Sequence, residues 1–206
     1  WTGLYKDDAI SSVEHRANLV LLLKYGMDFI KNYTMSGWVK MPNYRLNLPD
    51  YSDRAIFEGL VNHIIHRDYT VHIDIYDDRV ELVSPGAMLD GTQIQDRDIY
   101  KVPSMRRNPV IADVFTQLDY MEKRGSGLRK MRELTEKLPN FLQGKEPQYQ
   151  TEATSFYTTF YNLNWSENCR IPVEEVANRV NSILKKYPVN KKSSEKKYPV
   201  NKNSTL

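Results

Sequence analysis

The 206-residue sequence predicts an α/β (α+β) two-layer sandwich, in which helices cover one face of a mainly antiparallel sheet. Three observations predict this class: an amphipathic helical pattern over residues 52–66, two alternating segments directly after it, and an aromatic and β-branched segment at 154–163. The predicted order is helix, helix, strand, strand, loop, helix, helix, strand.

Residues 9–32 predict the first helix, because apolar residues recur there at helical spacing and Ser11 or Ser12 can cap its first turn. Residues 38–49 are interrupted by two prolines and predict an irregular or edge segment.

Residues 52–66 predict the second helix. Ser52 or Asp53 can accept the first free backbone N–H groups. Its apolar stripe consists of Phe57, Leu60, Val61, Ile64 and Ile65.

Segments 71–76 and 79–83 alternate with period two and predict a β-hairpin. A two-residue turn between them pairs Ile75 with Val80 and Ile73 with Leu82. The same register sets Asp74 opposite Glu81.

Residues 88–108 have no firm period and predict a long loop with one short helical turn. Residues 109–118 predict a helix with proline at its first position, and Gly125 and Gly127 precede a further helix.

Three polar residues of the second helix, Glu58, Asn62 and His66, are spaced by four and form one line at the edge of the apolar stripe. A carboxylate and a carboxamide facing a cleft can polarise a water and hold a magnesium ion. The alternative is an ordinary solvated flank of a helix.

Two more groups are candidates for binding an anion. The glycines of Gly125-Ser126-Gly127 allow close backbone approach before a helix N-terminus, although a flexible turn has the same sequence. Arg107 and Asn108 can contact a phosphate or a nucleic acid, or belong to a solvated loop in which Asn108 starts the next helix.

Four segments then carry a family resemblance, in this order: AIFEGLVNHIIHRDY (55–69), IYDDRVELVSPG (75–86), RNPVIA (107–112) and YMEKRGSGL (120–128). They resemble the bacterial RecG-helicase-related C-terminal domains, which occur in transcriptional regulators behind AlbA-like or schlafen-like DNA-binding domains. The resemblance covers residues 1–165. The family is similar in turn to the GHKL ATPase fold of gyrase, Hsp90, histidine kinases and MutL.

The resemblance implies a site for ATP and magnesium. Its implied roles are water activation by Glu58, magnesium binding by Asn62, an adenine-side turn at Ser84-Pro85-Gly86, phosphate contacts at Gly125-Ser126-Gly127, and an ATP lid at 88–108. With His66, Arg107 and Asn108 these residues form the predicted site.

The sequence departs from the fold's pattern at residues 84–87, which contain neither the aspartate that reads adenine nor a second glycine. ATP hydrolysis is therefore expected to be slow or absent. The alternative function is a non-catalytic module for dimerisation or signal relay. Helicase activity is not expected, because the chain has no Walker A lysine loop.

Composition narrows the class of protein further. No apolar run approaches the roughly 18 residues of a membrane span, and the single cysteine, Cys169, excludes an internal disulfide and a cysteine-based zinc site. We expect a piece of a longer cytoplasmic protein that contacts DNA through domains outside this chain.

Positive charge is concentrated in residues 170–206, which hold nine Lys or Arg against three Glu. The excess of positive charge in this segment is larger than the net charge of +3 of the whole chain. The remainder is slightly acidic and has no footprint for wrapping DNA.

Residues 166–206 predict a separate appendage made of an amphipathic helix and a basic linker with an 11-residue repeat at 185–204. The helix has a narrow apolar seam, formed by Val173, Val176, Ala177, Val180, Ile183 and Leu184. We expect two copies of the chain to bury this seam in a homodimer. The alternative is a monomer whose seam docks on its own body.

Overall fold

The computed structural model describes residues 11–41, 43–68, 70–103, 105–121, 125–167 and 169–186, with the backbone alone for 183–186. Its sheet has the order β3-β4-β6-β5, and every neighbouring pair is antiparallel. The strands are β3 (His72–Ile75), β4 (Arg79–Pro85), β5 (Gln148–Thr151) and β6 (Ser155–Tyr161).

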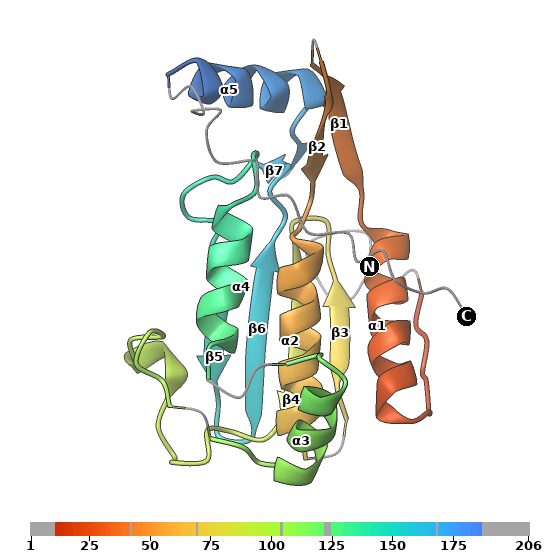
Figure 1. Ribbon diagram of the computed structural model, residues 1–206, viewed down its shortest axis with the longest axis vertical. Helices are drawn as coiled ribbons and strands as arrows, with labels where there is room; N and C mark the ends of the chain where they lie inside the picture. Colours follow the sequence, from red (N-terminus) through yellow and green to blue (C-terminus); the bar gives the residue numbers. More distant parts are fainter. Residues whose placement is uncertain are drawn as a thin grey trace, which may run out of the picture.

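Three helices lie over one face of this sheet (Figure 1), namely α1 (Leu19–Tyr33), α2 (Asp53–His66) and α4 (Gly127–Glu136). The main core lies between the two layers and includes Leu60, Ile64, Val80, Leu82 and Phe160. The predicted two-layer sandwich with a mainly antiparallel sheet is confirmed.

The predicted hairpin has the expected register, with Ile75 opposite Val80 and Ile73 opposite Leu82. Helix α2 also begins as predicted, because the Ser52 side chain accepts a hydrogen bond from the backbone N–H of Ala55.

The start predicted for the first helix is wrong. Residues 11–18 are not helical, and α1 begins at Leu19. Asn18 provides the cap in place of Ser11 or Ser12: its side chain accepts from the backbone N–H of Leu21 at 3.0 Å.

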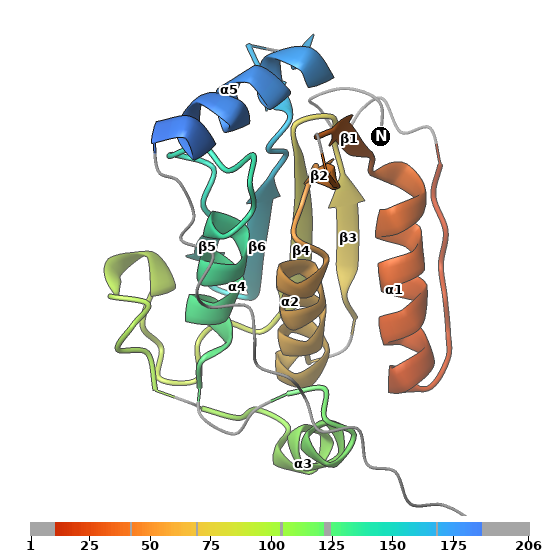
Figure 2. The same cartoon turned by 45° about the horizontal axis from the view of Figure 1, so that its top comes forward.

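The segment predicted as irregular or as an edge strand, 38–49, lies largely in a separate two-stranded hairpin formed by β1 (Ser36–Lys40) and β2 (Arg45–Pro49). Helix α5 (Val173–Lys186) packs across it (Figure 2). Val176 and Val180 of the seam are buried against Leu48 and Ile171, with Val39 and Leu46 alongside. Val176, Ala177 and Val180 of the seam are therefore covered within the chain, whereas Val173 is 37% exposed. Ile183, Leu184 and the linker repeat beyond residue 186 lie outside what the structure describes.

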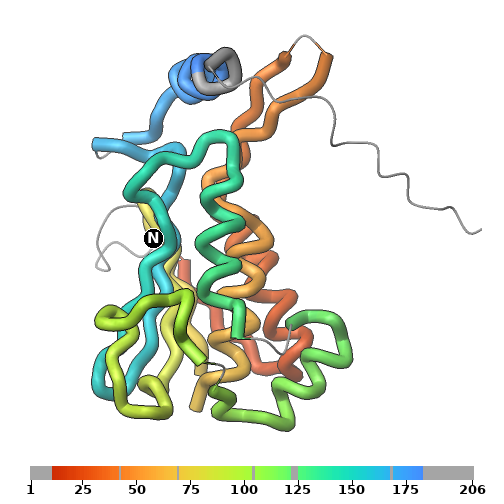
Figure 3. The backbone as a smooth tube through the Cα atoms, turned by 60° about the vertical axis from the view of Figure 1, so that its left-hand side comes forward, coloured from red at the N-terminus to blue at the C-terminus, as the bar shows by residue number. Residues whose placement is uncertain are grey.

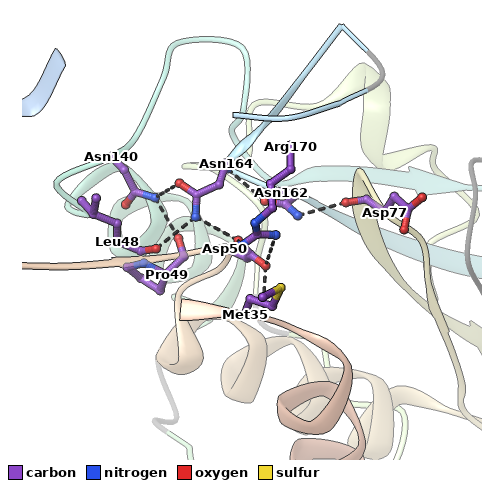
Figure 4. Close-up of polar contacts among 9 residues, drawn as sticks. All are labelled: Met35, Leu48, Pro49, Asp50, Asp77, Asn140, Asn162, Asn164 and Arg170. Atoms are coloured by element: carbon purple, nitrogen blue, oxygen red, sulfur yellow. Dashed lines mark hydrogen bonds and ion pairs between the residues drawn. The ribbon is translucent and has the colours of Figure 1, made fainter. Parts of the chain in front are cut away.

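A buried polar network joins this hairpin and the C-terminal segment to the sheet layer (Figure 4). The Asp50 carboxylate accepts hydrogen bonds from the backbone N–H of Met35, the Asn164 amide and both terminal nitrogens of Arg170. Arg170 belongs to the short pair β7 (Trp165–Ser166) and β8 (Cys169–Arg170). Residues on both sides of the predicted domain boundary, 165/166, thus share one network, and the boundary itself stays a prediction.

The long loop predicted at 88–108 contains one 3-10 turn, η2 (Ile94–Asp96), whose Ile94 is buried. Helix α3 (Pro109–Gln117) follows, with proline at its first position as predicted. Figure 3 shows this loop and α3 at one end of the molecule and α5 at the other.

Candidate functional site

One cavity lies between α2, α4, the inner side of the sheet and the loop that follows β4. Nine of the ten predicted site residues line it: Glu58, Asn62, His66, Ser84, Gly86, Arg107, Gly125, Ser126 and Gly127. Segments separated by up to 69 positions in the sequence therefore meet at one site. The roles of these residues in binding stay predictions.

Glu58 lies on the buried side of α2 and is engaged in an ion pair. Its Oε1 accepts a hydrogen bond from the Arg54 guanidinium at 2.8 Å, and the Lys130 ammonium on α4 is 4.0 Å from the same oxygen. A water activated by Oε1 would have to compete with a guanidinium that already occupies it.

Asn62 faces the start of α4. A Cβ added to Gly127 would lie 2.5 Å from Asn62 Nδ2 and 3.1 Å from Oδ1. A side chain at 127 would displace the Asn62 carboxamide, so glycine allows this close contact between α2 and α4, and the carboxamide lies beside the predicted phosphate turn.

The N-terminus of α4 opens onto the cavity, since Gly125, Ser126, Gly127 and Leu128 all line it. The Ser126 side chain makes no capping hydrogen bond. Ser126 thus leaves the first-turn N–H groups of α4 uncapped by its own side chain, and a helix N-terminus of this kind suits an anion.

Ser84 and Gly86 form the opposite part of the lining. Ser84 is buried, and its hydroxyl lies 2.9 Å from Nδ1 of His63. Gly86 has φ +110°, a conformation that favours glycine, and a Cβ added to it would lie 2.9 Å from Cζ of Arg107.

Arg107 links the two ends of the 88–108 loop through its hydrogen bonds. It donates one hydrogen bond to Asp68 at 2.9 Å and one to the carbonyl of Ala87 at 2.6 Å. Its guanidinium is thus engaged by a carboxylate and a carbonyl, while its side chain still lines the cavity.

Asn108 is outside the cavity lining. Its side chain donates to the carbonyls of Ile65 and Arg67 at 2.8 and 3.0 Å, at the C-terminal end of α2. It also precedes α3 without capping it through its side chain. The site prediction for Asn108 is therefore not supported by its geometry, because its amide is used to satisfy carbonyls that the helix end leaves free.

His66 lines the cavity next to the loop arginines. Burial, and then the positive charges of Arg107 and Arg106, lower the pKa of its imidazole. The ring is accordingly held in its neutral form more firmly than a free histidine.

The sequence analysis did not assign His63, Thr158 and Phe156 to the site, although all three line the cavity. Four methionines complete its apolar wall, at positions 88, 105, 121 and 131. His63 could not be recognised as a site residue from its own helix, because its hydrogen-bond partners are 21 and 95 positions away in the sequence.

A magnesium ion would find few protein ligands here. Among the described residues, no group of three or more His, Cys, Asp and Glu side chains is placed to hold a metal. Asn62 contributes an amide oxygen and Glu58 a carboxylate to the cavity lining, which fits the way magnesium binds through one or two protein ligands and completes its shell with phosphate and water.

None of the described helices combines the length and the apolar character that crossing a membrane requires.

The comparisons with known proteins agree with this architecture. No curated protein matches the sequence. The chain is similar in structure to the DIP2311 protein from Corynebacterium diphtheriae, with 21% identity and a TM-score of 0.58. The similarity covers 79% of this chain and 32% of that one, so this chain spans about a third of its length. At this identity the likeness shows the fold alone.

A family model described as "Putative ATP-dependent DNA helicase recG C-terminal" matches residues 68–160. The match includes Ser84, Gly86, Arg107 and Gly125 to Gly127, but it begins after α2 and leaves out Glu58 and Asn62. Residues 68–160 are therefore similar to the ATPase-like domain family of the RecG C-terminal region.

Proposed function

We propose that this chain is a nucleotide-binding regulatory domain of a bacterial transcriptional regulator, with ATP and magnesium bound in the cavity between α2 and α4. The observation that carries the proposal is the convergence of nine separately predicted residues on one cavity. Contact with DNA would belong to domains outside this chain, because the sequence before residue 170 is slightly acidic in net charge.

The two ends of the cavity suit the two ends of a nucleotide. The N-terminus of α4, which the Ser126 side chain does not cap, suits the phosphates, and Ser84 with Gly86 would lie beside the adenine base. Asn62 and Glu58 would hold magnesium, which neutralises the charge of the phosphates when it is bound.

Hydrolysis is proposed to be slow. Glu58 is ion-paired with Arg54 through Oε1, and the residues at 84–87 supply no carboxylate to anchor an adenine amino group. We expect turnover well below about 1 per second, the lower edge of ordinary enzyme rates.

Titration calorimetry of the chain with ATP and ADP, with and without magnesium, tests this proposal. We expect saturable binding of ATP, and in Asn62→Ala a loss of about tenfold in the affinity measured with magnesium. Asn47→Ala, an exposed asparagine on β2, is the matched control and should bind as the unmodified chain does. The absence of any saturable heat would overturn the proposal.

A second candidate function is a non-catalytic dimerisation or signal-relay module. The observation that favours it is an apolar stripe on α3, where Val110, Val114 and Leu118 are spaced by four and are 76%, 47% and 44% exposed. Exposed aliphatic side chains in such a row are typical of a surface that another molecule covers.

A further inference from the structure

His63 is a buried histidine with a hydroxyl at each ring nitrogen. Its Nδ1 lies 2.9 Å from Ser84 Oγ on β4, and its Nε2 lies 2.9 Å from Thr158 Oγ1 on β6. All three side chains are buried and all three line the cavity. The binding of phosphates and magnesium proposed above uses none of them.

His63 is buried, and the partners of its two ring nitrogens are hydroxyls rather than carboxylates, which favours the neutral imidazole. A neutral imidazole has one N–H, which donates, and one bare nitrogen, which accepts.

The two hydroxyls around His63 therefore take different hydrogen-bonding roles. The hydroxyl that accepts from the ring N–H keeps its own O–H free to donate elsewhere. The hydroxyl that donates to the bare nitrogen has only lone pairs left to offer. Ser84 and Thr158 thus present one donor and one acceptor, and a change of tautomer at His63 exchanges the two roles.

A purine base presents the complementary pair. Adenine has an amino donor at position 6 beside the acceptor N1, whereas guanine has a carbonyl acceptor at position 6 beside the donor N1–H. A carboxylate accepts only, so it matches the amino group of adenine and rejects the carbonyl of guanine.

We propose that His63, Ser84 and Thr158 read the base of the bound nucleotide and accept adenine and guanine nucleotides alike, each with a different tautomer of His63. This inference rests on the proposed nucleotide site. It makes the two hydroxyls the specificity-determining groups and His63 the residue that positions their protons.

Calorimetric titration of the chain with ATP and with GTP is the first test. We expect the two dissociation constants to agree within about fivefold, and Thr158→Val to weaken both by about fivefold, the effect of one ordinary hydrogen bond. Thr135→Val is the matched control: Thr135 is buried, its hydroxyl donates to the Met131 carbonyl within α4, and it is not part of the cavity lining.

The outcomes separate this inference from the proposed function. If neither nucleotide binds, the nucleotide site itself is wrong. If ATP binds and GTP is weaker by roughly thirtyfold or more, as one good base contact can achieve, the site stands and the inference is overturned.

Nitrogen-15 NMR of the His63 ring is the second test, because the shifts of its two nitrogens report which one carries the proton. We expect ATP and GTP to shift the tautomer equilibrium in opposite directions. A structural role alone would leave the same tautomer in both complexes, and that result would overturn the inference.

Discussion

At the scale of single residues, His63 links the cavity to the stability of the fold. Because burial, and secondarily His66, lower its pKa to about 3, the folded chain keeps this ring neutral where an unfolded histidine, with a pKa near 6.5, takes up a proton. Between these values the unfolded state binds more protons than the folded state. The free energy of unfolding therefore falls as the pH falls from about 6.5 towards 3, and this group contributes no pH dependence above that window.

Urea denaturation between pH 7.5 and pH 4.5 measures this effect. In His63→Gln we expect the fall in the free energy of unfolding to be shallower than in the unmodified chain, by up to about 1.4 kcal/mol per pH unit below pH 6. His72→Gln, at an exposed position on β3, retains His63 and should follow the unmodified chain. Parallel curves for the His63 variant and the unmodified chain would show that this histidine is not held neutral.

At the scale of elements, the Asp50 network attaches the β1–β2 hairpin and the C-terminal segment to the body. Asp50 is 2% exposed, and its ion pair with Arg170 has an Nη2–Oδ1 distance of 2.7 Å. Removing one member of such a pair leaves the other without its counter-charge in a site that water reaches poorly.

Asp50→Asn is therefore expected to lower the free energy of unfolding by about 3 kcal/mol, measured by urea denaturation near pH 7. Asp53→Asn is the matched control, because its contact with Lys31 is 3.7 Å long and both side chains are more than half exposed. We expect its effect to stay below about 0.5 kcal/mol. Equal losses in the two variants would contradict the assignment of Asp50 as a structural hub.

The elements that sequence reasoning predicted well are those specified by contacts between near neighbours. The hairpin of β3 and β4 follows from alternation across a two-residue turn, and α2 follows from one apolar stripe behind Ser52. Strand β5 was missed, because its sequence QYQT is short and polar and it is a strand only through pairing with β6.

The site shows the same division between local and distant information. The line of Glu58, Asn62 and His66 is visible in one helix, and the glycines of 125–127 are visible in one turn. By contrast, the Lys130 ammonium near Glu58 and the distant hydroxyls around His63 become apparent only when α2 packs on α4 and the sheet. The Arg54 partner of Glu58 lies four positions earlier on the same helix, at a spacing that the sequence already contains. Asn108 was assigned to the site because its helix-capping contacts 41 and 43 positions away are invisible in the sequence.

At the scale of the whole molecule, Val176, Ala177 and Val180 of the α5 seam are not available as a contact between copies, whereas Val173 at its start is 37% exposed. Val176, Ala177 and Val180 are 2%, 4% and 2% exposed, as the monomeric alternative expects for this seam. The homodimer remains our proposal for the oligomeric state, and the stripe of α3 is the surface that we assign to it. This stripe lies at the end of the molecule opposite α5 (Figure 3).

Light scattering at micromolar concentration measures the mass directly. We expect the mass of two chains for the unmodified protein and of one chain for Val114→Asp, because a carboxylate in the centre of the stripe would have to be buried without a partner. Val180→Asp is the matched control: the same substitution at the buried seam should loosen α5 from the β1–β2 hairpin and lower thermal stability, yet leave the dimer intact. A single-chain mass for the unmodified protein would exclude the homodimer. Dissociation of the dimer by Val180→Asp but not by Val114→Asp would show that the interface is the α5 seam and not the stripe of α3.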